Sequence, residues 1–92
     1  MSIEVKAFKL TTGEEIIARA EQQRDIMILH KPMSFQPVPT QVQGTVGMAL
    51  VPWLMSAKDD IIEISLTHIV IETEPKKDIE KNYLSTISGI AL

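Results

Sequence analysis

Apolar and polar side chains alternate over residues 5–29, which predicts two strands around a turn and the start of a third. Phe8 and Leu10 lie two residues apart, so their side chains share one face of the first strand. Gly13 takes a positive φ at little cost, as many tight hairpin turns require. The second strand keeps the period of two with Ile16, Ala18 and Ala20. Alanines on the core face indicate a strand that bends strongly over a small core, as in small barrels.

Further strands follow from the same pattern. The predicted strands cover residues 3–10, 14–21, 26–30, 45–53, 61–66 and 69–74. Residues 33–43 contain Pro37 and Pro39 among glutamines, and they predict an extended segment of polyproline II character rather than a paired strand. The runs 26–29 and 69–71 are apolar on both faces, so each is expected to be covered twice, by the core and by another strand or subunit.

After Pro75 the period changes. Ile79, Tyr83 and Ile87 recur every four residues, which predicts a helix with one apolar stripe, beginning at Pro75. The chain of 92 residues is long enough for one small domain. We therefore expect a barrel over residues 1–74 and a helix with a tail over 75–92, both parts of a single domain.

Charge is spread unevenly along the chain. Residues 1–58 hold six basic and five acidic side chains, residues 59–92 hold three and seven, and the net charge is −3. Nucleic-acid binders usually carry a basic excess. The basic residues of the first part either form a local basic face or only solvate the surface; they are Lys6, Lys9, Arg19, Arg24, Lys31 and Lys58.

The segment 32–57 carries no charge, but its four prolines and many polar residues do not fit a membrane span. The first residues lack the pattern of a signal peptide. We expect no membrane contact and a cytoplasmic location. Met33, Met48, Trp53 and Met55 in this segment either fill the core or form a subunit interface, and the prolines favour an interface.

Six residues of the first part fall in the order and spacing of a known signature: Leu10, Gly13, Ala18, Asp25, Met27 and Leu29. This stretch resembles the first signature of the Sm-like family, which includes the bacterial RNA chaperone Hfq. Ala18 stands where the family has glycine, and Ile28 stands where the family has an asparagine that helps to hold an RNA base. Residues 64–70 resemble the second signature, two strands joined by a very short turn. The turn residues are Thr67 and His68, where the bacterial branch has lysine and histidine.

The resemblance implies a mainly β protein with a small, strongly bent antiparallel barrel of Sm-like, SH3-like type and a C-terminal helix. It implies a homo-oligomeric ring of roughly five to seven subunits closed through edge strands. It also implies binding of single-stranded U- or A-rich RNA. The RNA-contacting candidates are Asp25, Met27, Thr67 and His68. The interface candidates are Ile64, Leu66, Ile69, Val70, Ile71, Trp53 and Met55.

Other chemistry finds little support in the residues. The chain has no cysteine and two histidines, and no metal-ligand spacing, phosphate loop or nucleophile elbow is present in its sequence. Asp59 and Asp60 are predicted to solvate a turn. His68 either contacts a base or satisfies carbonyl groups of its own turn. We therefore expect no enzyme and no cofactor, and a scaffolding ring without RNA is the alternative function.

Overall fold

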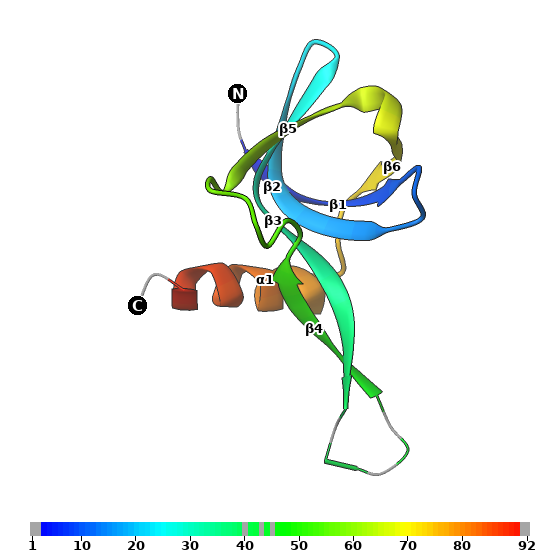
Figure 1. Ribbon diagram of the computed structural model, residues 1–92, viewed down its shortest axis with the longest axis vertical. Helices are drawn as coiled ribbons and strands as arrows, with labels where there is room; N and C mark the ends of the chain where they lie inside the picture. Colours follow the sequence, from blue (N-terminus) through cyan, green and yellow to red (C-terminus); the bar gives the residue numbers. More distant parts are fainter. Residues whose placement is uncertain (1–2, 40, 43, 45, 91–92) are drawn as a thin grey trace.

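Antiparallel strands that curl around one core, with a helix at the C-terminus, make up the architecture of the computed structural model, which describes residues 3–39, 41–42, 44 and 46–90 (Figure 1). The elements are β1 (Glu4–Leu10), β2 (Glu15–Gln23), β3 (Ile26–Pro39), β4 (Val46–Pro52), β5 (Ile61–Ser65), the 3₁₀ turn η1 (Leu66–His68), β6 (Ile69–Thr73) and α1 (Lys77–Ile90). The sheet order is β4-β3-β2-β1-β6, and β5 also pairs with β3. The mainly β fold with one C-terminal helix is the fold expected from the sequence.

Two apolar clusters lie on the two faces of the bent sheet. The inner cluster contains the five alternating residues predicted to share the core face, Phe8, Leu10, Ile16, Ala18 and Ala20, together with Met27 and Leu29 of β3. The outer cluster joins Ile17 and Met33 of the sheet to Tyr83 and Ile87 of α1. β2 is therefore buried on both faces, because the helix covers the face that Ile17 occupies. The predicted apolar stripe of the helix is confirmed.

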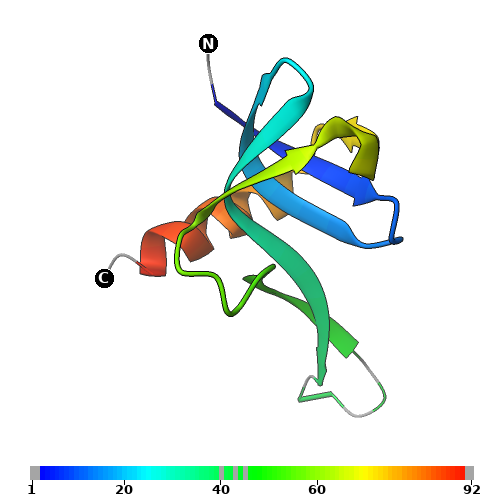
Figure 2. The same cartoon turned by 45° about the horizontal axis from the view of Figure 1, so that its top comes forward.

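β3 is longer than the sequence suggested. It continues to Pro39 and pairs with β4 along residues 33–39, so the prediction of an unpaired polyproline segment is wrong there. Residues 40 and 43 of that segment lie outside the described residues. Met33 is also buried in the outer cluster, so it fills the core rather than an interface. Residues 33–39 of β3 and 46–52 of β4 form a two-stranded ribbon, the arm, which projects beyond the barrel (Figure 2).

A bulge marks the point where β3 leaves the barrel. Ile17 pairs with Met33 and Arg19 with His30, so two residues of β3, Lys31 and Pro32, stand opposite one residue of β2. Lys31 has a φ of 51°, which is uncommon for a residue with a side chain. On the other side, β3 pairs with β5 up to His30 and with β4 from Met33 onward.

Five backbone groups at this bulge find partners outside the β2–β3 ladder. The Tyr83 hydroxyl accepts from Arg19 N–H at 3.2 Å and lies 3.0 and 2.9 Å from the carbonyl oxygens of His30 and Lys31. Lys31 N–H donates to Asp60 O, and Trp53 N–H donates to Pro32 O. One tyrosine of the C-terminal helix therefore completes the hydrogen bonding that the sheet gives up at the bulge.

The helix begins later than predicted. It runs from Lys77, and Pro75 lies before its first turn. The Lys76 carbonyl oxygen accepts the first helical hydrogen bond, from Glu80 N–H at 2.9 Å. Among the described residues, no helix combines the length and the apolar character that crossing a bilayer requires.

Candidate nucleic-acid interface

Two turns that are far apart in the sequence meet at one end of the barrel. The β2–β3 turn contains Arg24 and Asp25, and η1 contains Thr67 and His68. Leu66 N–H donates to Asp25 O at 3.1 Å, one step beyond the pairing of Ile26 with Ser65. The predicted RNA-contacting residues Asp25, Thr67 and His68 are thus brought to the same end of the molecule.

The η1 turn is held on its other side as well. Thr11 N–H of the β1–β2 turn donates to His68 O at 2.9 Å. Within η1, the Ser65 hydroxyl caps the turn by accepting from Thr67 N–H, and it lies 2.9 Å from the Thr67 hydroxyl. These bonds fix the backbone that carries the exposed side chains of Thr67 and His68.

The structure gives Met27 a different place from the other three candidates. Its side chain is 2% exposed and packs in the inner cluster, because residues 27 and 29 point into the barrel. Ile26 and Ile28 alternate with them and are half-buried. Met27 therefore supports the turn from below, and its side chain is not presented to a ligand.

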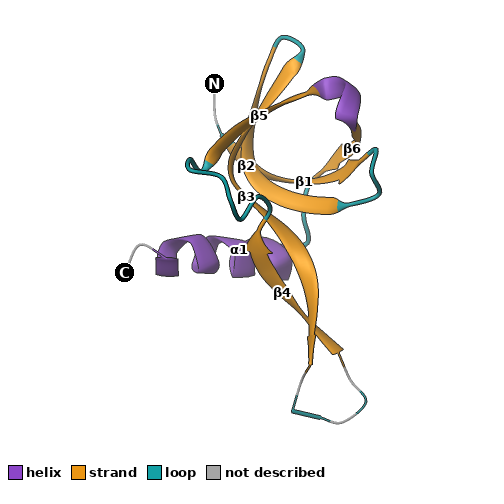
Figure 3. Cartoon of the chain, in the orientation of Figure 1, coloured by secondary structure: helices purple, strands orange, loops and turns teal. Residues whose placement is uncertain are grey.

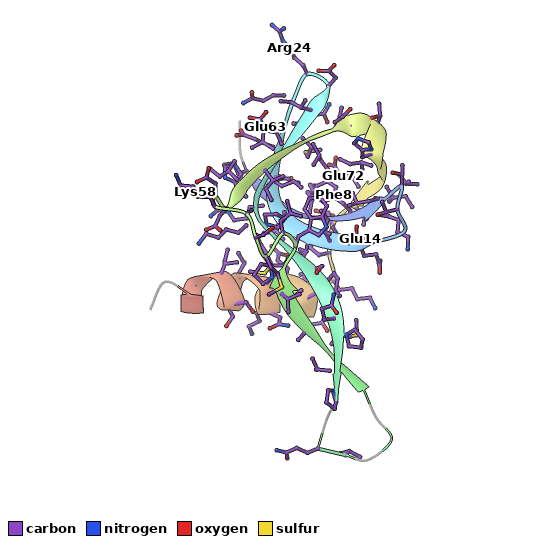
Figure 4. The ribbon with its side chains drawn as sticks, viewed as in Figure 1. Phe8, Glu14, Arg24, Lys58, Glu63 and Glu72 are labelled. Carbon is purple, nitrogen blue, oxygen red and sulfur yellow. The ribbon has the colours of Figure 1, made fainter. Side chains whose placement is uncertain are left out.

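Arg24 belongs to this end of the barrel, and sequence reasoning had not placed it there. It stands at the tip of the β2–β3 turn with a φ of 57° (Figure 4). Gln22 Nε2 donates to Arg24 O at 3.2 Å. Residues 22–26 line an open depression of about 590 Å³. The polar break Gln22–Asp25 was visible in the sequence, but its pattern does not show that an arginine occupies the strained position of the turn.

Two acidic side chains lie on the strands next to η1. Glu63 of β5 and Glu72 of β6 flank η1 on the strands that enter and leave it (Figure 4). His30, the second histidine, lies elsewhere in β3, with its Nε2 3.8 Å from Glu21 Oε1. Within the part of the chain that the structure describes, no three His, Cys, Asp or Glu side chains are grouped as a metal site would require.

The candidate interface strands β5 and β6 are edges of the sheet. Among the described strands, β5 pairs only with β3 and β6 only with β1, and η1 joins them across the opening of the barrel (Figure 3). Val70 and Ile71 of β6 are 60% and 54% exposed, and Ile61 of β5 is 55% exposed. Large aliphatic side chains thus stand beside both unpaired edges.

The other predicted interface residues fall into two groups. Ile64, Leu66, Ile69 and Trp53 are half-buried and pack against the inner cluster, and Trp53 also donates from Nε1 to Glu14 Oε2 at 3.3 Å. Met55 is 81% exposed on the loop before β5. The first group therefore contributes to the core of the single chain, whereas Met55 is open to solvent.

Five strands follow one path, a short 3₁₀ turn joins the two edge strands, and a hydrogen bond connects the β2–β3 turn to it. A comparison of the sequence with protein families agrees with this arrangement. The model of the Sm_like domain matches residues 7–84, which include both signatures and most of α1. The chain belongs to the Sm-like family. Sm-like proteins typically form oligomers. No curated protein sequence matches the chain.

Proposed function

We propose that this Sm-like chain assembles into a closed ring by pairing the β5 edge of one copy with the β6 edge of the next. Two unpaired edges on opposite sides of the same opening fit a heterologous contact, which closes into a ring when the rotation permits. That contact would bury the exposed side chains of Ile61, Val70 and Ile71 and remove them from water. The resemblance implies roughly five to seven subunits.

The ring is proposed to bind single-stranded RNA at the end formed by the β2–β3 turn and η1. One observation carries this proposal, the hydrogen bond from Leu66 N–H to Asp25 O, which holds the two turns together before any ligand arrives. Exposed histidine and arginine side chains suit the stacking and hydrogen bonding by which unpaired bases are held. Asp25, Thr67, His68 and Arg24 are the proposed contacts, and the U- or A-rich preference rests on the resemblance.

Recovery of nucleic acid from protein purified without nuclease tests the proposal directly, and labelled U-rich and A-rich oligonucleotides then measure affinity at low salt. We expect binding that weakens steeply as salt rises. His68→Ala and Arg24→Gly should weaken it about tenfold or more. The Arg24→Gly substitution removes a charge without a folding penalty, because glycine tolerates the positive φ at this position.

Lys58→Ala is the matched control. It also removes one positive charge, but from the loop before β5, away from the two turns (Figure 4). If Lys58→Ala and Arg24→Gly weaken binding equally, the contact is general electrostatic attraction and the assigned site is wrong. Absence of binding at about 50 μM RNA in low salt would contradict RNA binding altogether.

A ring that acts as a scaffold without RNA is the second candidate. The acidic net charge of −3 and the glutamates beside η1 favour it. A closed ring by native mass spectrometry, together with protein free of nucleic acid, would support the scaffold.

A further inference from the structure

The arm offers a second edge for association, separate from β5 and β6. It extends from the barrel in the direction opposite to the β2–β3 turn (Figures 1 and 2). Residues 32–57, which include the whole of the arm, carry no charged side chain. Met48 of β4 is 58% exposed. Such a ribbon lacks the charges with which proteins usually protect exposed strands.

Hydrogen-bond alternation determines which backbone groups of the arm face outward. Trp53 N–H donates to Pro32 O, and the same register pairs Ser34 with Val51 and Gln36 with Ala49. In an antiparallel ladder, pairs that exchange hydrogen bonds alternate with pairs whose N–H and C=O groups point away. The bonded pairs are therefore 32/53, 34/51, 36/49 and 38/47. The intervening residues direct their groups outward; they are 33, 35, 37 and 39 of β3 and 46, 48, 50 and 52 of β4.

The two outer edges consequently differ. On β3, two of the outward positions are Pro37 and Pro39, which have no N–H to donate. On β4 the outward positions include Met48 and Leu50, both with N–H groups, and β4 pairs with β3 alone among the described strands. Pro52 takes the outward position of β4 next to the barrel, and it has no N–H to donate there. Prolines thus block the outer part of the β3 edge against strand addition and leave the β4 edge open over residues 46–50.

We propose that β4 pairs in antiparallel fashion with β4 of a second copy of this chain, across a two-fold axis at Met48. Each Met48 would then stand opposite its own image, and residue 46 of each copy opposite Leu50 of the other. The outward groups at 46, 48 and 50 are symmetric about Met48, so the strand is complementary to itself in this register.

The absence of charge favours an identical strand as the partner. A charged strand would bring side chains that nothing on the arm can neutralise, whereas two uncharged copies meet without repulsion. The contact does not depend on the proposed ring, because it uses neither β5 nor β6. If the ring forms, the arms join two rings; if it does not, they join two single chains.

A charge-swap experiment at Met48 tests the pairing. Native mass spectrometry of the full chain from about 1 to about 100 μM should show species with twice the subunit number of the basic assembly. Met48→Lys alone and Met48→Glu alone should each weaken the doubling about tenfold or more, because like charges would face each other across the axis. An equimolar mixture of the two variants should restore it.

Two further variants separate the arm contact from other effects. Val38→Lys places the same charge on β3 of the arm, two strands from the axis, and should leave the doubling unchanged. Met48→Pro removes an outward N–H that takes no part in the β3–β4 ladder, and it should abolish the doubling while the arm stays paired. The proposal is overturned if wild-type protein shows no doubled species, if Met48→Lys doubles as wild type does, or if the mixture fails to recover. In Val70→Asp, designed to break the ring, the arm contact should persist as a dimer of single chains.

Discussion

At the scale of single residues, Tyr83 joins the C-terminal helix to the bulge in β3. Its hydroxyl accepts from Arg19 N–H and donates to the carbonyls of His30 and Lys31. The sequence predicted that Tyr83 is buried, because it belongs to a stripe of period four. It could not predict what the hydroxyl does, since its partners come together only when a bulge in β3 meets the helix.

Tyr83→Phe should lower the free energy of unfolding by about 1 kcal/mol, because Arg19 N–H and two carbonyl groups would lose a part-buried hydrogen-bond partner. Urea unfolding followed by the fluorescence of the single tryptophan, Trp53, measures this change. Tyr83→Leu, which also loses ring packing, should cost more. Equal stability of Tyr83→Phe and wild type would show that the hydroxyl does not support the bulge.

The same residue predicts a dependence of stability on alkaline pH. Burial raises the pKa of Tyr83 above its ordinary value of 10.0, although the hydrogen bond from the Arg19 backbone and the Arg19 charge both oppose the shift. The unfolded chain therefore releases this proton first as pH rises. The stabilising contribution is complete below pH 10 and is lost as pH rises through the folded pKa.

This pH dependence can be measured on one residue, because Tyr83 is the single tyrosine. Absorbance of tyrosinate should titrate above pH 10 in the folded protein. The difference in unfolding free energy between wild type and Tyr83→Phe should shrink as pH rises above 10. Titration of the lysines does not affect this difference, because both proteins contain the same lysines. A difference in unfolding free energy that stays constant above pH 10 would contradict the raised pKa of Tyr83.

At the scale of elements, strand positions followed from alternation, but the length of β3 did not. Pro37 and Pro39 suggested an unpaired segment, yet both occupy outward positions where the ladder needs no N–H. The sequence alone does not distinguish these positions from inward ones, because the hydrogen bond between Trp53 N–H and Pro32 O sets which pairs of the ladder are bonded.

The spacing of Asp25, Thr67 and His68 suggested one site through the resemblance. The burial of Met27 and the positive φ of Arg24 follow only from the folded barrel.

Substitution at an edge strand tests the proposed ring. Val70 is the extra residue where the β6–β1 register shifts, and its exposed side chain makes Val70→Asp tolerable in the single chain. A carboxylate at this edge should resist burial against the next subunit. We expect native mass spectrometry to show loss of the ring at low micromolar concentration with little change in the circular dichroism spectrum.

Thr73→Asp, farther along β6, serves as a comparison because Thr73 is also exposed. It should disturb the ring less than Val70→Asp, since no large apolar side chain is replaced. A ring of unchanged mass in Val70→Asp would mean that β6 is not the subunit contact.

At the scale of the whole molecule, the barrel, the helix and the arm meet at one short stretch, residues 30–33. There β3 exchanges β5 for β4, and α1 contacts it from outside. The family match over residues 7–84 covers both the barrel and the arm. The charge-free arm and its open β4 edge offer an association separate from the one proposed through β5 and β6.

The position of Tyr83 also bears on how the chain is made. Its partners Arg19, His30 and Lys31 precede it by 64, 53 and 52 residues. Since synthesis proceeds from the N-terminus, both strands of the bulge exist well before the hydroxyl that completes them. The hydrogen bonds of Arg19 N–H and of the His30 and Lys31 carbonyl groups at the bulge are therefore completed only after residue 83 has been synthesised. A chain that stops earlier keeps open backbone groups at the junction of barrel and arm, and proteases that remove unfinished proteins are expected to cut there first.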